Sequence, residues 1–162
     1  MSANSTGPAG PRRVAVVYHP MKVEESTFRR LVTLKSLEHG WSEPVFLPTS
    51  LADPGQAVTK LAFAAGAERI LAAGGDGTVR AVTTTLRDTA VPSAIIPTGT
   101  GNLLARNLGI SLDILTALDI AFTGKVRDVD LAQLVVDYDN EHPAYFTGMA
   151  GVGFDAALML DT

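Results

Sequence analysis

Two hydrophobic patterns alternate along the chain. Short continuous apolar runs, rich in β-branched residues, are typical of strands buried on both faces of a sheet. They predict strands at 14–18, 44–47, 69–73 and 93–96. Between these runs, apolar residues recur every three or four positions, as they do in helices. They predict helices at 24–39, 53–65, 78–87, 102–108 and 111–122. Because strand and helix alternate four times, the pattern predicts an α/β fold, an open and mostly parallel sheet with helices on both faces.

Polar residues mark where two of these helices begin. Asp53 is expected to be a helix N-cap, with Pro54 in the first helical position, where a missing N–H costs little. Ser111 is expected to cap the last helix in the same way.

The pattern changes after residue 124. Residues 126–136 alternate and then become apolar, 137–142 are a polar turn, and 144–149 form a second extended run. This arrangement predicts a β-hairpin rather than another strand–helix unit. The expected division is a disordered tail at 1–11, an α/β domain at 12–124, and the truncated start of a β-rich second domain at 125–162.

Composition narrows the class of protein. Apolar residues make up 46% of the 162 residues, enough for a full core, and the charged fraction is 19%. The net charge of −4 argues against a nucleic-acid partner, because phosphate backbones select basic surfaces. There is no cysteine, which excludes disulfides and cysteine-ligated zinc and fits a cytoplasmic location. Apolar runs fall short of the roughly 20 residues that cross a bilayer.

A glycine-rich loop, Gly74-Gly75-Asp76-Gly77-Thr78, follows the third predicted strand. Glycines let a ligand approach the backbone closely, and consecutive N–H groups with a helix N-terminus bind anions. An acid in such a loop is repelled by phosphate unless a cation lies between them. Asp76 is therefore expected to act through Mg²⁺ or to bind a hydroxyl. The alternative is a simple strand-to-helix turn in which Asp76 and Thr78 are caps.

A second loop, 97–102, has the same design one strand later. Thr100 can donate its hydroxyl to a phosphate or to a metal-bound water. Asn102 either caps the next helix or contacts a ligand. The P-loop lysine motif and the dinucleotide G-x-G-x-x-G motif at the first strand are both absent.

Two further strands end in polar residues, His19 before Pro20 and Thr49. The carboxyl ends of parallel strands share one sheet edge, so four loops are expected to converge there. His19 is a candidate ligand contact or a turn residue. Arg80 either reaches phosphate or is a solvated arginine. The acids Asp128, Asp130, Asp137 and Asp139 around the hairpin form either a metal cluster or ordinary turn positions.

The sequence resembles the diacylglycerol kinase catalytic-domain family, to which sphingosine and ceramide kinases are related. The resemblance lies in four segments, 73–79 around the first glycine-rich loop, 96–106 around the second, 129–131 and 151–156. It implies a two-domain enzyme with ATP in the cleft between the domains. It implies nucleotide contacts at Gly74, Gly75, Asp76, Gly77, Thr78, Val79, Arg80, Thr100 and Thr49. The loop 19–23 departs from the family's usual Asn-Pro-x-Ser-Gly.

The activity implied is transfer of the γ-phosphoryl of ATP to a lipid hydroxyl, most simply that of diacylglycerol, with Mg²⁺ as cofactor. In soluble bacterial members the proton acceptor lies in the second domain, so Asp76 is the in-chain candidate for a base and is more readily seen as holding Mg²⁺–ATP. Such an enzyme would meet its lipid peripherally, at the inner membrane surface. A NAD kinase-like enzyme and a non-catalytic nucleotide-binding module, its hairpin covered by a partner or by a homodimer mate, are the alternatives.

Overall fold

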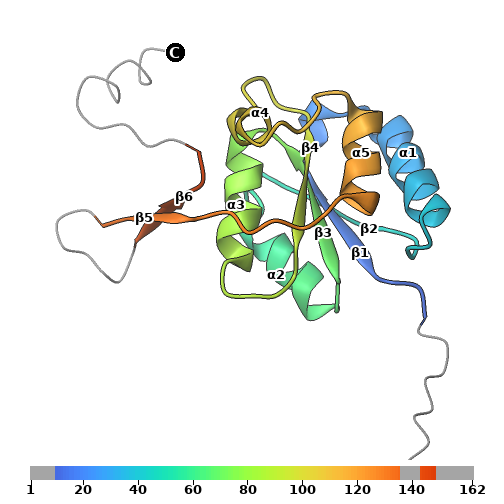
Figure 1. The fold of residues 1–162 in the computed structure, drawn as a ribbon, viewed down its shortest axis with the longest axis horizontal. Helices are drawn as coiled ribbons and strands as arrows, with labels where there is room; N and C mark the ends of the chain where they lie inside the picture. The colour runs from blue at the N-terminus through green and yellow to red at the C-terminus, as the bar shows by residue number, and fades with distance from the viewer. Residues whose placement is uncertain (1–9, 136–142, 149–162) are drawn as a thin grey trace, which may run out of the picture.

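A four-stranded parallel sheet forms the centre of the computed structural model, which describes residues 10–135 and 143–148 (Figure 1). Its strands lie in the order β2-β1-β3-β4. Their bounds are Val14–Tyr18 for β1, Val45–Pro48 for β2, Arg69–Gly74 for β3 and Ser93–Pro97 for β4. All three pairings are parallel, so the predicted sheet is confirmed.

Helices cover both faces of the sheet, as predicted (Figure 1). On one face α1 (Glu25–Glu38) and α5 (Ile114–Thr123) pack together, and on the other α2 (Gln56–Ala64) packs beside α3 (Asp76–Leu86). A short helix α4 (Leu103–Asn107) and a single 3₁₀ turn η1 (Pro20–Lys22) complete this part. The layers make the α/β fold a three-layer arrangement.

The continuous apolar runs follow from this two-sided cover. In β1, Val16 and Tyr18 join the core under α1 and α5, whereas Ala15 and Val17 join the core under α2 and α3. Side chains alternate between the faces of a strand, so a strand covered on both sides is apolar along nearly its whole length. Full burial of each large apolar side chain contributes about 1.5–3 kcal/mol.

Two predicted helix starts are wrong. Helix α2 begins at Gln56 with Gly55 as N-cap, so Pro54 lies outside it. Asp53 still serves this helix, because its carboxylate accepts from the N–H groups of Ala57 and Val58 at 3.0 and 3.1 Å. Helix α5 is capped by Asp113 rather than Ser111.

The carboxylate of Asp113 accepts from the Thr116 N–H at 2.8 Å. The hydroxyl of Ser111 instead accepts from the Asp113 N–H at 3.2 Å and shapes the turn before the helix.

The predicted hairpin is present but short. Strands β5 (Ala132–Leu134) and β6 (Ala144–Phe146) pair antiparallel. The Arg87 guanidinium at the end of α3 lies 4.6 Å from the ring centre of Tyr145 in β6. The predicted tail, the hairpin turn and the segment 151–156 lie largely or wholly outside the described residues, and the domain boundaries stay predictions. No helix in the described ranges is long and apolar enough to cross a membrane.

Candidate functional site

The two glycine-rich loops touch each other at the carboxyl edge of the sheet. They follow the adjacent strands β3 and β4, whose ladder ends in the pair Gly74 and Pro97. The Thr98 N–H donates to the Gly74 carbonyl at 3.2 Å. A Cβ on Gly99 would lie 2.3 Å from the Gly75 Cα, closer than real contacts allow. The loops are therefore in backbone-to-backbone contact, which only glycine permits.

Asp76 joins the two loops. Its Oδ1 accepts from the Leu103 N–H, the first residue of α4, at 2.7 Å. Its Oδ2 faces the second loop, 2.9 Å from where a Cβ on Gly101 would stand. The carboxylate thus caps a helix 27 residues away rather than its own. Sequence reasoning missed this role, since no local pattern reports a contact between separate loops.

Asn102 locks the second loop and does not cap α4 with its side chain. Its backbone is left-handed, with φ 51° and ψ 44°, and it is 7% exposed. Its Nδ2 donates to the Gly99 carbonyl at 2.7 Å, and its Oδ1 accepts from the Gly99 N–H at 3.1 Å. Both polar atoms of the amide are used inside the loop. Asn102 thus occupies the N-cap position of α4, one of its two expected roles, without a side-chain bond to the helix, and its contact with a ligand stays a prediction.

The N-terminus of α3 provides free hydrogen-bond donors. Its N-cap is Gly75, which has no side chain, and no described residue accepts from the N–H groups of Asp76, Gly77 or Thr78. The first-turn N–H groups of a helix lack partners within the helix and carry its positive dipole end. An anion placed here would meet three donors and a favourable field.

The next positions of α3 do not all face that end. Val79 is 5% exposed and belongs to the core between α3 and the sheet, so its side chain is not available to a nucleotide. The side chain of Thr78 packs against Gly74, where a Cβ would lie 2.5 Å from it. Gly77 and Arg80 are exposed.

The remaining predicted residues lie around these loops. Thr100 is exposed on the second loop. The His19 N–H donates to the Ala73 carbonyl at 2.9 Å, which places this turn beside the first loop. Its Nδ1 accepts from the Met21 N–H at 3.2 Å, so the ring serves as the cap of η1, the turn role left open above.

Thr49 stands farthest from the glycine-rich loops. It is buried after β2, and its N–H donates to the Tyr18 carbonyl at 2.8 Å. Three strand spacings separate β2 from β4 in the sheet, about 14 Å at the usual distance between strands. A ligand reaching both Thr49 and Thr100 has to cross most of the sheet edge.

One hydroxyl at the loops was missed by sequence reasoning. The Oγ1 of Thr98 is buried and has no hydrogen-bond partner in the described part of the chain. Buried hydroxyls are normally hydrogen-bonded, but those of Thr59 and Thr84 also lack a partner in the described residues, so this group does not by itself mark a ligand site. In the sequence, the only indication of a role for Thr98 was its position inside the second loop, between Pro97 and Gly99.

A protein-only metal centre is not found within 10–135 and 143–148. No group of three or more His, Cys, Asp or Glu side chains comes together there, and of the four acids around the hairpin this finding covers only Asp128 and Asp130. Asp137 and Asp139 lie outside the described residues. Asp76 is the one acid in the segments 74–80 and 97–103, so a cation at the loops would need further oxygens from its ligand.

Comparison with known proteins agrees with this geometry. The family "Diacylglycerol kinase catalytic domain" matches residues 13–134. A protein named "Probable lipid kinase YegS-like" from Pseudomonas syringae pv. syringae is 31% identical over 153 residues, which cover 93% of this chain and 47% of the relative. A protein named "Diacylglycerol kinase" from Bacillus subtilis is 32% identical over 146 residues, covering 88% and 46%.

Solved structures of diacylglycerol kinases also match this chain. The crystal structure of a diacylglycerol kinase from Bacillus anthracis superimposes with a TM-score of 0.60 at 26% identity. The match covers 74% of this chain and 42% of that one. The chain thus spans about half the length of the curated relatives it matches. Since the family match spans the sheet, both glycine-rich loops and the start of the hairpin, this chain belongs to the diacylglycerol kinase catalytic-domain family.

Proposed function

We propose that this chain is the nucleotide-binding part of an ATP-dependent lipid kinase, which transfers the γ-phosphoryl of ATP to a lipid hydroxyl. Diacylglycerol is the simplest acceptor, met peripherally at the inner membrane surface from the cytoplasmic side. The observation that carries the proposal is the pair of touching glycine-rich loops joined by Asp76. The names of the relatives, lipid kinase and diacylglycerol kinase, support the acceptor class.

The phosphates of ATP are assigned to the N-terminus of α3. Its unpartnered N–H groups at 76–78 donate to phosphate oxygens, and the dipole of this 11-residue helix favours their charge. Gly75 and Gly77 leave room for the close approach. Exposed Arg80, one turn into the same helix, and Thr100 on the facing loop are the side chains that reach the outer phosphates.

Mg²⁺ fits the donor set at the loops. In nucleotide sites Mg²⁺ takes one or two carboxylates together with phosphate oxygens, and Asp76 supplies one carboxylate. Its Oδ1 is occupied by the Leu103 N–H, which leaves Oδ2 as the oxygen for the cation. Bound Mg²⁺ would neutralise phosphate charge during transfer.

The protein's own contribution is positioning. Phosphoryl transfer needs an aligned donor and acceptor and fixed charges more than covalent participation by the enzyme. Asn102 holds the second loop in one shape, and the Arg106 Nε, which donates to the Gly101 carbonyl at 2.9 Å, secures its far end. Asp76 is also the candidate to accept the proton of the lipid hydroxyl.

Calorimetric titration with ATP, with and without Mg²⁺, tests the nucleotide site. We expect the chain to bind Mg²⁺–ATP more tightly than ATP alone. Asp76→Asn keeps an oxygen that can accept from the Leu103 N–H but removes the charge, so it should fold normally and lose most of the Mg²⁺ enhancement. Asp76→Ala should in addition lose about 1 kcal/mol of stability with the cap. Binding that is absent, or unaffected by Mg²⁺, would contradict the proposal.

A transfer assay with labelled ATP then separates the acceptor classes. Label appearing in dioleoylglycerol supports the lipid kinase. Label appearing in NAD would favour the NAD kinase-like alternative. Nucleotide binding with transfer to neither would favour a nucleotide-binding module.

A further inference from the structure

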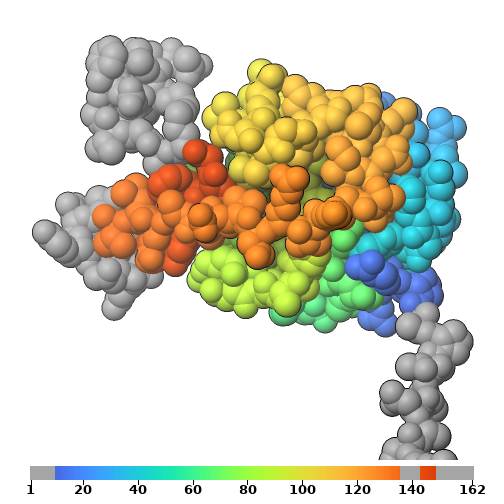
Figure 2. Space-filling view, in the orientation of Figure 1, coloured from blue at the N-terminus to red at the C-terminus, as the bar shows by residue number. Residues whose placement is uncertain are grey.

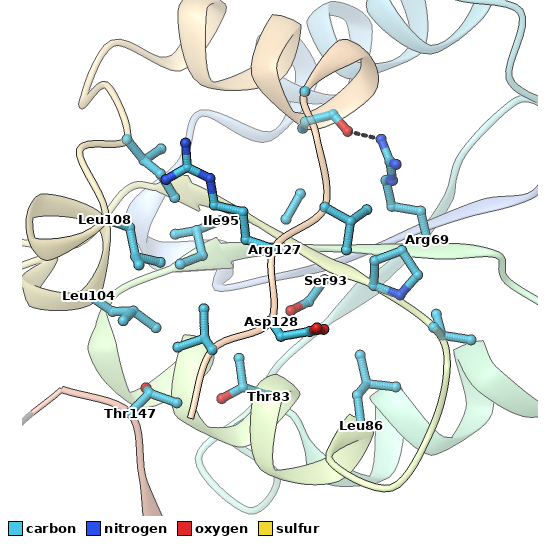
Figure 3. Close-up of a pocket in the computed structure, with 18 of the residues that line it drawn as sticks. Arg69, Thr83, Leu86, Ser93, Ile95, Leu104, Leu108, Arg127, Asp128 and Thr147 are labelled. Carbon is cyan, nitrogen blue, oxygen red and sulfur yellow. Dashed lines mark hydrogen bonds between the residues drawn. The ribbon is translucent and has the colours of Figure 1, made fainter. Parts of the chain in front are cut away.

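One cavity of the described residues lies away from the glycine-rich loops. It has a volume of about 690 Å³ and lies along the outer side of β4, the last strand of the sheet (Figure 3). The cavity is bounded by α3, α4 and α5, and the extended segment 125–131 crosses it (Figure 2). Its lining includes Ser93 and Ile95 of β4 but no residue of the loop segments 74–80 and 97–103.

Part of the wall of this cavity is apolar and is formed by Leu86 of α3, Ile95, Leu104, Leu108, Ile120 and Val126. Polar side chains such as Thr83, Thr89 and Ser93 line other parts of it. Several of the apolar side chains remain open to solvent: Ile120 is 42% exposed and Val126 62%. Exposed apolar residues gathered in a concave site are a common feature of ligand pockets.

The charges of the cavity are positive although the chain is not. Arg69, Arg87, Lys125 and Arg127 line it, against the single carboxylate of Asp128. The whole chain carries a net charge of −4. Arg87 pairs with Asp88 at 3.1 Å, but neither Lys125 nor Arg127 forms an ion pair with a described residue. A local excess of cations on an acidic protein favours an anionic occupant.

Arg69 is the buried member of this set. It is 6% exposed, and one of its nitrogens donates to the Ala121 carbonyl in the last turn of α5 (Figure 3). No carboxylate of the described residues pairs with it. Burial, and secondarily the charge of Arg12, lower the pKa of this guanidinium. The Trp41 ring, 4.8 Å from the guanidinium carbon, and the Ala121 carbonyl offset part of the cost of burying this cation, and an anion in the cavity would offset more of it.

We propose that this cavity binds a single-chain phosphorylated lipid, with its phosphate at the cations and its acyl chain along the apolar walls. An inorganic anion would leave the walls unused, and a neutral lipid would leave the cations unpaired. A phosphate monoester carries about −1.5 to −2 charges, a better match to the net excess here than a carboxylate. The site is separate from the nucleotide loops, so the proposal does not depend on the proposed function.

Calorimetric titration of the chain with 1-oleoyl lysophosphatidate, kept below the concentration at which it forms micelles, tests this site. We expect one lipid per chain. Arg127→Gln and Lys125→Gln remove exposed cations and should each weaken binding about fivefold, the upper range for an exposed ion pair. Lys60→Gln, an exposed lysine on α2 away from the cavity, should bind as the unchanged chain does. Asp76→Asn should also bind normally, which separates this site from the nucleotide site.

Three other ligands test whether the cavity recognises both the phosphate and the acyl chain. Sodium oleate, monooleoylglycerol and inorganic phosphate are each expected to bind at least about fivefold more weakly than lysophosphatidate. Equal binding of monooleoylglycerol, or of inorganic phosphate, would overturn the proposal, as would equal binding of oleate. So would a Lys60→Gln variant weakened as much as Arg127→Gln, or no binding of lysophosphatidate at all.

Discussion

The glycines of the two loops have different structural roles, which the sequence alone does not distinguish. Gly99 lies against the Gly75 backbone, and a Cβ there would come within 2.3 Å of the Gly75 Cα. Gly77 has no atom within 4 Å of such a Cβ, and its backbone is helical. The first glycine is needed for the contact between the loops, and the second is not needed for the fold.

Alanine at each position should therefore have opposite effects. Gly99→Ala forces the two backbones apart and should lower the free energy of unfolding by about 1–3 kcal/mol, as overpacking does in cores. Gly77→Ala should leave stability unchanged or raise it by up to about 1 kcal/mol, because alanine favours a helix. Urea denaturation of both variants measures this. Equal losses would show that the loop contact is not what requires glycine.

Only part of the site was predictable residue by residue. The glycine and threonine content of the loops indicated an anion site, and the free N–H groups of α3 agree with it. The role of Asp76 as the cap of α4, and the use of both Asn102 polar atoms on Gly99, were not predictable. Each depends on how close two loops come in space, which local spacing does not encode.

At the level of helices and strands, the sequence predicted which elements exist but misplaced the starts of two helices. Ser111 and Asp113 are both good caps two residues apart, and the chain path before α5 brings the Asp113 carboxylate to the first-turn N–H groups. Asp53 caps α2 from three residues ahead of the helix, because Gly55, with φ 141°, turns the chain in between. A preference for capping residues cannot choose between paths of this kind.

Glu24 makes the start of α1 sensitive to acid. Its carboxylate accepts from the Ser26 and Thr27 N–H groups at 3.2 and 2.8 Å and from the Ser26 hydroxyl. These bonds, with those to Thr27 the strongest, lower its pKa from 4.5 to about 2. A lowered pKa means that the ionised form stabilises the fold. The contribution is complete above about pH 4.5 and is lost as the pH falls toward 2.

Glu24→Gln should therefore matter only where Glu24 is ionised. The variant keeps an acceptor oxygen but lacks the charge, so its free energy of unfolding should be lower than that of the unchanged chain at pH 7. The difference should shrink as the pH falls from 4.5 toward 2. Urea unfolding of both proteins at several pH values tests this. A difference that stays constant across that window would show that the charge of Glu24 is not responsible.

Across the whole molecule, the layered core was the most predictable feature. Continuous apolar runs such as Val14–Tyr18 predict strands in a sheet that is covered on both faces, and all five residues of this run are buried. The strand order and the cavity beside β4 were not predictable, since both depend on which strand is left at the edge. The hairpin was predicted from its alternation, and its short length of three residues in each strand was not.

The sheet and the hairpin should differ in the rate at which their backbone N–H groups exchange hydrogen with solvent. Strands β1 and β3 are paired on both sides and fully buried, so their N–H groups should exchange only on global unfolding. The hairpin β5–β6 has two short, mostly exposed strands, and isolated hairpins are marginal in water. Its N–H groups should exchange orders of magnitude faster, as measured by mass spectrometry. Equal protection would show that the hairpin opens only together with the sheet.

The stacking around Trp41 gives this chain a built-in optical reporter. Trp41 is its single tryptophan, 3% exposed, with the Arg12 guanidinium 3.9 Å and that of Arg69 4.8 Å from its ring. Arg69 also lines the cavity beside β4. Cations close to an indole shift its emission, so the fluorescence of one native residue registers changes at a cavity wall without any attached dye.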